Sequence, residues 1–180
     1  MNELCFGNRL IYKVNPELPP LLLEEMLEQV KGYSTVDGTV GTNHIRKSIR
    51  KSAIHWLPWD HWIAGVLHNI MISANNDFFK FDLDHFSDGI QITRYDPGGH
   101  YTWHRDSTNG KTRKLSISLL LNDDYTGGEL ELESKPDSFL CTPKAGEAIL
   151  FPSWLSHRVK PVKTGHRISL VAWMNGPEFK

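Results

Sequence analysis

The sequence contains little cysteine, no excess of charge of either sign and no long apolar run. Its 180 residues include two cysteines, Cys5 and Cys141, too few for a disulfide framework or a cysteine-rich zinc site, so we expect reduced thiols. The 20 Lys and Arg against 21 Asp and Glu give no global field for recruiting nucleic acid. No stretch approaches the roughly 18 apolar residues of a membrane span, and residues 1–12 lack the apolar segment of a secretory signal. We therefore expect a cytoplasmic protein without a membrane partner.

Several familiar reaction motifs are also absent. The chain has no Gly-x-Ser-x-Gly elbow, no Gly-rich phosphate loop ending in Gly-Lys, and no His-Glu-x-x-His pair. Its 39% hydrophobic and 23% charged residues are ordinary for a globular protein, which excludes disorder, collagen and coiled coil. The length predicts a single domain over residues 1–180.

The first part of the chain predicts two helices. Apolar residues recur at helical spacing from Asn15 to Val30, and again from Asp60, a candidate N-cap, to about Asn75. Between them, Gly32–Lys51 loses this periodicity and reads as a mobile loop or a short edge strand. The segment ends in a basic run, interpreted first as solvated surface and alternatively as a substrate lid: His44, Arg46, Lys47, Arg50 and Lys51.

From about residue 78 the chain alternates short β-like runs with turn clusters such as Asp96-Pro97-Gly98-Gly99. The count and spacing suit a sandwich or jelly roll. We therefore predict an α+β, mainly β fold, with helical support over residues 1–77 and a β core over about 78–176. The expected strands are Gly89–Tyr95, Tyr101–His104, Lys114–Leu121, Glu129–Glu133, Phe139–Cys141, Glu147–Phe151, His157–Pro161 and His166–Trp173.

Histidine and carboxylate residues carry the chemical signal. His104 and Asp106 are two positions apart, so a strand directs both side chains to one face. By chance such a triplet would be common, but His157 follows at the start of another β run. Two imidazoles and one carboxylate would make a facial triad, the open site that non-heme Fe(II) oxygenases use. Because such a site keeps net positive charge, it should attract a chelating dianion. The turn around Thr164-Gly165 should return the chain as a strand beside the one that bears His157, so Arg167, ten residues after His157, could bind the far carboxylate.

With these residues in place, the chain resembles the 2-oxoglutarate- and Fe(II)-dependent dioxygenases, specifically their prolyl-4-hydroxylase-like branch. That family shows His-x-Asp, a distal His, and Lys or Arg about ten residues later. The flanking segments Gln91–Asp106, Gly127–Leu130 and Gly146–Pro152 are similar to family segments as well. The resemblance covers roughly Gln91–Trp173 and implies a double-stranded β-helix (a cupin-like jelly roll) with two supporting N-terminal helices.

The resemblance also implies a role for each site residue. His104, Asp106 and His157 would bind Fe(II), and Arg167 would hold the distal carboxylate of the cosubstrate 2-oxoglutarate with help from the Tyr95 hydroxyl. Trp173 would pack beside the site. O₂ is the second cosubstrate, and ascorbate is the reductant that the family suggests. One departure stands out: relatives in the oxygen-sensing group carry a cosubstrate tyrosine on the strand where this chain has Leu119–Leu121.

The expected activity is hydroxylation of a C–H bond, coupled to release of succinate and CO₂. A proline-containing peptide or protein is the substrate that the resemblance favours; a small metabolite, a free amino acid or a nucleic-acid base would fit the same chemistry. The segments Gly32–Lys51 and Asp106–Lys114 are expected to select the substrate. A non-catalytic jelly-roll binding module is the alternative from another class.

Overall fold

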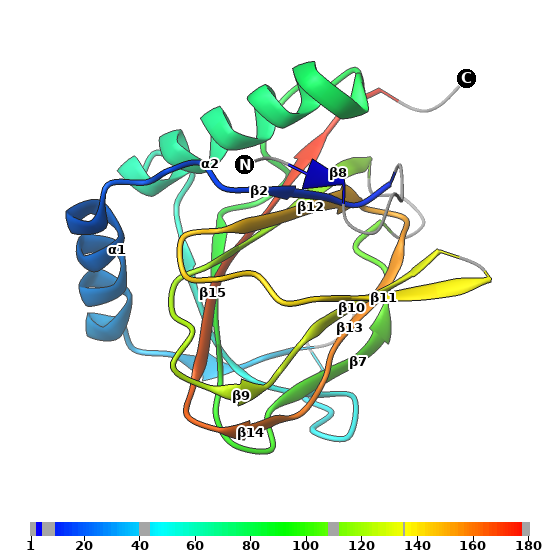
Figure 1. Cartoon of the computed structure of the whole chain (residues 1–180). Coiled ribbons are helices and arrows are strands. Elements are labelled where there is room, and N and C mark those ends of the chain that lie inside the picture. The colour runs from blue at the N-terminus through cyan, green and yellow to red at the C-terminus, as the bar shows by residue number, and fades with distance from the viewer. Residues whose placement is uncertain (1–2, 5–9, 40–43, 108–111, 135, 178–180) are drawn as a thin grey trace.

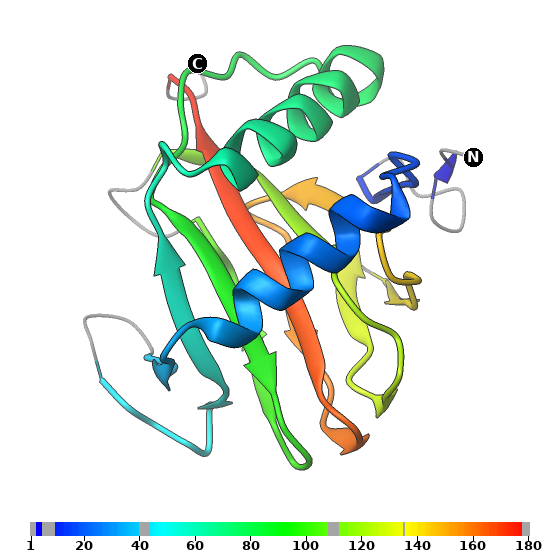
Figure 2. The ribbon, with the colours of Figure 1, turned by 90° about the vertical axis from the view of Figure 1, so that its left-hand side faces the viewer.

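A computed structural model of the chain describes residues 3–4, 10–39, 44–107, 112–134 and 136–177. Two antiparallel sheets face each other, and two helices cover the outer face of the larger sheet (Figures 1 and 2). Cys5 lies outside the described residues, whereas Cys141 is buried.

The larger sheet has eight strands among the described residues. In spatial order they are β1 (Glu3–Leu4), β2 (Tyr12–Val14), β12 (Ala148–Pro152), β8 (Arg113–Leu120), β15 (Arg167–Asn175), β6 (Ile90–Tyr95), β5 (Ala53–Leu57) and β3 (Val36–Asp37). The smaller sheet contains β11 (Asp137–Cys141), β10 (Leu130–Ser134), β13 (Ser156–Val159), β7 (His100–His104) and β4 (Arg50–Lys51). A short pair, β14 (Val162–Thr164) and β9 (Thr126–Gly127), lies at one end.

The larger sheet is buried on both faces, and its two faces differ in chemistry. On β8, Leu115, Ile117 and Leu119 pack in one apolar core with the helices, while Ser116 and Ser118 alternate with them and face the smaller sheet. The strands β15 and β6 follow the same alternation, because successive side chains of a strand point to opposite faces. Polar residues are therefore collected between the two sheets.

The two predicted helices are present as α1 (Pro20–Gly32) and α2 (Trp62–Ala74), and a π-helical turn, Asn75–Phe79, follows the second. The assignment of Asp60 as the N-cap was wrong. The side chain of His61 caps α2 instead, because its Nδ1 accepts the backbone N–H of Ile63 at 3.3 Å. Within the described residues, neither helix is long and apolar enough to cross a lipid bilayer.

All eight predicted strands are observed, with ends shifted by one or two residues. The prediction was incomplete for the first 77 residues, where β2 and β5 add strands to the larger sheet on opposite sides of its centre. The segment Gly32–Lys51 contains the short strands β3 and β4, and its residues 40–43 lie outside the described part.

Candidate active site

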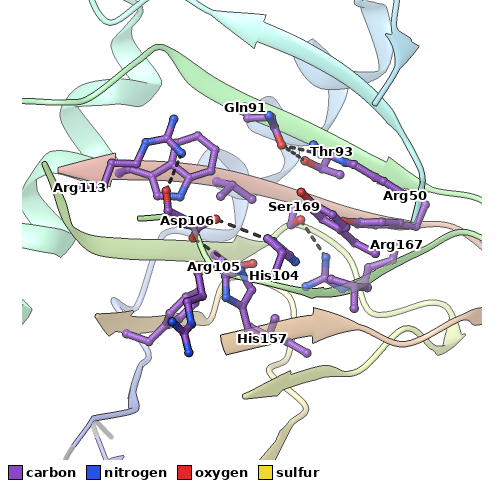
Figure 3. Close-up of a pocket in the computed structure, with 18 of the residues that line it drawn as sticks. Arg50, Gln91, Thr93, His104, Arg105, Asp106, Arg113, His157, Arg167 and Ser169 are labelled. Atoms are coloured by element: carbon purple, nitrogen blue, oxygen red, sulfur yellow. Dashed lines mark hydrogen bonds and ion pairs between the residues drawn. The ribbon is translucent and has the colours of Figure 1, made fainter. Parts of the chain in front are cut away.

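A cavity of about 570 Å³ lies between the two sheets (Figure 3). The smaller sheet contributes the ends of β7 and β13, and the larger sheet contributes the polar faces of β6, β8 and β15. All six site residues predicted from the sequence line it: Tyr95, His104, Asp106, His157, Arg167 and Trp173.

His104, Asp106 and His157 converge on one point in this cavity. His104 and His157 are direct partners across β7 and β13, and Asp106 follows the end of β7. The Nε2 atoms of His104 and His157 lie 3.8 and 3.6 Å from the two carboxylate oxygens of Asp106. One ligand atom from each residue lies within 4.8 Å of the others, so the three side chains can share a single metal ion.

Hydrogen bonds orient each of these ligands. The Nδ1 atoms of His104 and His157 lie 2.8 and 3.0 Å from the carbonyl oxygens of Thr102 and Leu155, so both rings present Nε2 to the shared point. On the other side, the Ser116 hydroxyl donates to the Asp106 carboxylate at 2.7 Å. The donor set of two imidazole nitrogens and one carboxylate suits Fe(II) and leaves coordination positions open.

The protonation states favour metal binding as well. Burial, together with the neighbouring His157, lowers the pKa of His104 to about 3, against the opposing effect of Asp106. Burial raises the pKa of the Asp106 carboxyl, but His157 and His104 outweigh it, so this pKa lies below its usual value. Near neutral pH, His104 is therefore a neutral imidazole and Asp106 an ionised carboxylate, the forms in which these side chains can bind a metal.

Arg167 is the first residue of β15 and is only 2% exposed. Its Nη1 donates to the Ser169 hydroxyl at 2.9 Å, and no described carboxylate pairs with it. The expected neighbour of its strand was wrong: β15 pairs with β6 and β8 in the larger sheet, not with β13. The chain changes sheets through β14, so Arg167 faces the cavity from the sheet opposite His157.

Tyr95 and Trp173 are buried at the cavity wall. Burial raises the pKa of the Tyr95 hydroxyl, and the nearby charges of Arg50 and Arg167 act against this rise. The guanidinium of Arg113 lies 4.0 Å from the centre of a Trp173 ring. The indole N–H of Trp173 is buried and makes no hydrogen bond of good geometry among the described residues. It is nevertheless close enough to the Asp106 carboxylate to help lower the pKa of that group.

Several residues in or next to this cavity were not predicted from the sequence. Tyr101 stacks on His104 with ring centroids 3.5 Å apart, and Ser116 supports Asp106. Arg50, assigned to a solvated basic run, is buried and lines the cavity. Tyr125 lies next to Arg167, which opposes the effect of burial in raising the Tyr125 pKa. Tyr101 gave no usable signal either, because three residues along a regular strand would put it on the face opposite His104. An irregularity in the pairing of β7 with β13 brings the two rings together.

Comparison with known proteins gives a consistent result. Residues 90–175 match the family model described as the 2OG-Fe(II) oxygenase superfamily. The chain is 39% identical over 89 residues to a PKHD-type hydroxylase of Synechococcus sp. strain CC9902, and 40% identical over 89 residues to one of Picosynechococcus sp.. Each alignment covers 47% of this chain and 40% or 41% of the relative, so the chain spans about two-fifths of the curated relatives it matches.

Two solved structures have a similar fold. A prolyl hydroxylase of Trichoplax adhaerens, in complex with a peptide fragment of a hypoxia-inducible factor, has a TM-score of 0.82 at 19% identity and covers 95% of this chain and 86% of its own. A prolyl-4-hydroxylase of Pseudomonas putida has a TM-score of 0.77 at 23% identity, with 92% of both chains covered. These likenesses confirm the predicted double-stranded β-helix with two supporting helices.

Proposed function

We propose that this chain, which is similar to 2OG-Fe(II) oxygenases over residues 90–175 and to prolyl hydroxylases in its fold, hydroxylates a C–H bond of a peptidyl proline. In the balanced reaction, 2-oxoglutarate, O₂ and R–H give succinate, CO₂ and R–OH. The observation that carries this proposal is the placement of His104, Asp106 and His157 in one cavity with the buried Arg167.

His104, Asp106 and His157 would hold the metal through two Nε2 atoms and a carboxylate oxygen. Bound Fe(II) would supply the activation of O₂ that makes an unreactive C–H bond oxidisable. The protein supplies fixed ligands: both imidazoles are oriented by backbone carbonyls, and Asp106 is kept ionised and bonded to Ser116. This arrangement holds the ligands ready for the ion.

Arg167 would bind the distal carboxylate of 2-oxoglutarate, and the Tyr95 hydroxyl would donate to the same cosubstrate. A guanidinium matches a carboxylate through two parallel hydrogen bonds, and its burial at 2% exposure strengthens that attraction. Ser169 holds Nη1 on one side, which fixes the direction of the fork. Trp173 and Tyr101 add aromatic walls that exclude water from the metal ligands.

The structural likeness to prolyl hydroxylases, one of them solved with a peptide, supports a proline-containing peptide or protein as substrate. The cavity is partly open and, at about 570 Å³, larger than a five-carbon diacid requires, which leaves room for a substrate side chain. We further propose that residues 1–180 act as one oxygenase domain, because β2 and β5, which precede residue 78, are strands of the larger sheet. Ascorbate dependence and a cytoplasmic location remain predictions.

The decisive experiment is anaerobic reconstitution with Fe(II) and 2-oxoglutarate, followed by admission of O₂. We expect a weak visible metal-to-ligand charge-transfer band, then succinate, with more succinate when proline-containing peptides are present. The His157→Ala variant, checked for folding by circular dichroism, should show neither signal. A folded, metal-supplemented protein without band or succinate would overturn the proposal in favour of a binding module. Band and succinate with no response to any proline peptide would limit the failure to the substrate.

A further inference from the structure

Arg50 is a second buried arginine in the cavity, and the proposed chemistry gives it no role. It lies on β4 at the end of the basic run, yet only 7% of its surface is exposed, whereas its neighbour Lys51 points outward. The backbone of Gly38 covers it so closely that a Cβ there would lie 2.7 Å from Arg50 Nε. Figure 3 shows Arg50 at the same end of the cavity as Arg167.

The hydrogen bonds of Arg50 all go to neutral groups. Nε donates to the Ser52 hydroxyl at 2.9 Å, Nη1 to the carbonyl of Thr39 at 3.3 Å and Nη2 to Gln91 Oε1 at 2.7 Å. Its guanidinium also lies 4.7 Å from the centre of the Tyr101 ring. A guanidinium carries five N–H donors, so two are left after these three bonds. They lie near the Tyr95 hydroxyl, because Arg50 acts on the pKa of that group both by its charge and by a hydrogen bond. No carboxylate of the described residues pairs with it.

Charge balance separates Arg50 from the cosubstrate. With metal and cosubstrate bound, the two positive charges of Fe(II) and the one of Arg167 would balance three negative charges, one on Asp106 and two on 2-oxoglutarate. Among the described lining residues, Asp106 is the only carboxylate, and Arg113 already pairs with Asp88 outside this set. The buried charge of Arg50 is therefore left without a counter-ion when metal and cosubstrate are bound, which is costly in a low-dielectric site.

We propose that Arg50 binds a carboxylate of the substrate, so that the pocket selects prolines that carry a carboxylate on or beside the ring. This inference rests on the proposed function. It names a substrate feature with two sources: the terminal carboxylate of proline itself, or an acidic side chain next to a peptidyl proline. A flat carboxylate can accept from the N–H groups that these bonds leave on the planar guanidinium, beside the Tyr95 hydroxyl. Arg50 is thus assigned to substrate specificity, and Arg167 to the cosubstrate.

The test measures binding rather than turnover. Full-length protein is loaded anaerobically with Mn(II) and 2-oxoglutarate, and four probes are titrated by calorimetry: N-acetylproline, N-acetylprolinamide, acetyl-aspartyl-prolinamide and acetyl-asparaginyl-prolinamide. The first pair tests a terminal carboxylate and the second an acidic neighbour. We expect one acid to bind about tenfold or more tightly than its matched amide, as for pairing a buried charge. The pair that discriminates identifies the source.

Three variants assign the effect to Arg50. Arg50→Gln should abolish the preference for the acid, Arg50→Lys should restore part of it, and Arg94→Gln, which removes an exposed arginine of β6, should leave it unchanged. Affinity for 2-oxoglutarate should stay within about twofold in both Arg50 variants, because the positive charge at residue 50 is not needed to balance the charge of the cosubstrate. Equal binding of acid and amide by the natural protein, absence of binding by all four probes, or a loss of 2-oxoglutarate affinity in Arg50→Gln as large as in Arg167→Gln would overturn the inference. Failure of the proposed function would instead appear as absence of the Fe(II)–2-oxoglutarate band.

Discussion

His104 and His157 face each other directly across β7 and β13, with ring centroids 4.1 Å apart. These two residues are 53 positions apart in the chain, and they meet because antiparallel pairing sets opposite residues close together. Each ring is held by a carbonyl of its own strand segment, at Thr102 and Leu155. The imidazole pair is therefore built into the sheet itself, whereas Asp106 lies beyond the strand end and needs separate support.

Ser116 provides that support, so its removal should weaken metal binding without unfolding the protein. In Ser116→Ala the Asp106 carboxylate loses its 2.7 Å hydrogen bond. We expect Fe(II) affinity to fall about 10–100-fold, the usual cost of losing a partner of a metal ligand. Anaerobic Fe(II) titration measures this effect. Ser118→Ala, two residues along the same strand and lining the same cavity, is the matched control and should bind iron normally.

Arg167→Ala should weaken 2-oxoglutarate binding by about 2–5 kcal/mol, the range for unpairing a buried charged group. Iron binding should remain, because Arg167 does not contact the three metal ligands and bonds to Ser169. Titration of 2-oxoglutarate into the Fe(II)-loaded variant, followed by the charge-transfer band, gives the affinity. Unchanged affinity would remove Arg167 from the cosubstrate site, and concurrent loss of iron would point to general disruption.

Sequence patterns predicted the strands and the grouping of His104, Asp106 and His157 because both depend on local regularities. Alternation along Lys114–Leu121 reports a buried strand, and the spacing of His104 and Asp106 reports a common face. Arg167 lines the cavity as predicted, but its strand was assigned to the wrong sheet. The turn at Gly165 can be recognised in the sequence, whereas the pairing of β15 with β6 and β8 depends on contacts between distant parts of the chain.

The burial of Arg50 could not be predicted for a related reason. A basic run is usually solvated, and nothing local distinguishes Arg50 from Lys51. Pairing of β4 with β7 sets the two residues on opposite faces, so that one enters the cavity and the other faces solvent. The cap of α2 shows the same limit at short range, since Asp60 is the preferred residue type for an N-cap, yet the backbone geometry places His61 there.

Acidification should destabilise the metal-free protein through His104. Its pKa is about 3 in the folded state and near 6.5 when unfolded, so the unfolded state binds more protons between these values. Stability should therefore fall as pH decreases from about 6.5 towards 3, by up to a few kcal/mol. Chemical denaturation of metal-free protein across this range measures the slope. His104→Gln should flatten it, while His100→Gln, on the same strand, should not; equal slopes in all three proteins would contradict this origin.

Gly128→Ala should affect both stability and cosubstrate binding, because Gly128 provides the space in which the Arg167 side chain lies. Its φ is +66°, and a Cβ would lie 2.9 Å from Val162 Cγ2, 3.2 Å from Arg167 Cδ and 3.3 Å from the Tyr125 ring. The left-handed backbone alone should cost about 1 kcal/mol or more of unfolding free energy, and displacement of Arg167 should in addition raise the Kd for 2-oxoglutarate.

Gly146→Ala separates these two effects. Gly146 has a similar positive φ of +84°, but its Cβ would meet only Leu23 at an ordinary 3.5 Å. Both variants should therefore lose stability in urea denaturation, whereas only Gly128→Ala should lose affinity for 2-oxoglutarate in the Fe(II)-loaded protein. Equal cosubstrate affinity in the two variants would mean that contact with a side chain at residue 128 does not impair 2-oxoglutarate binding by Arg167. The hydrogen bond to Ser169 and the groups inside the cavity would then be sufficient to orient its guanidinium.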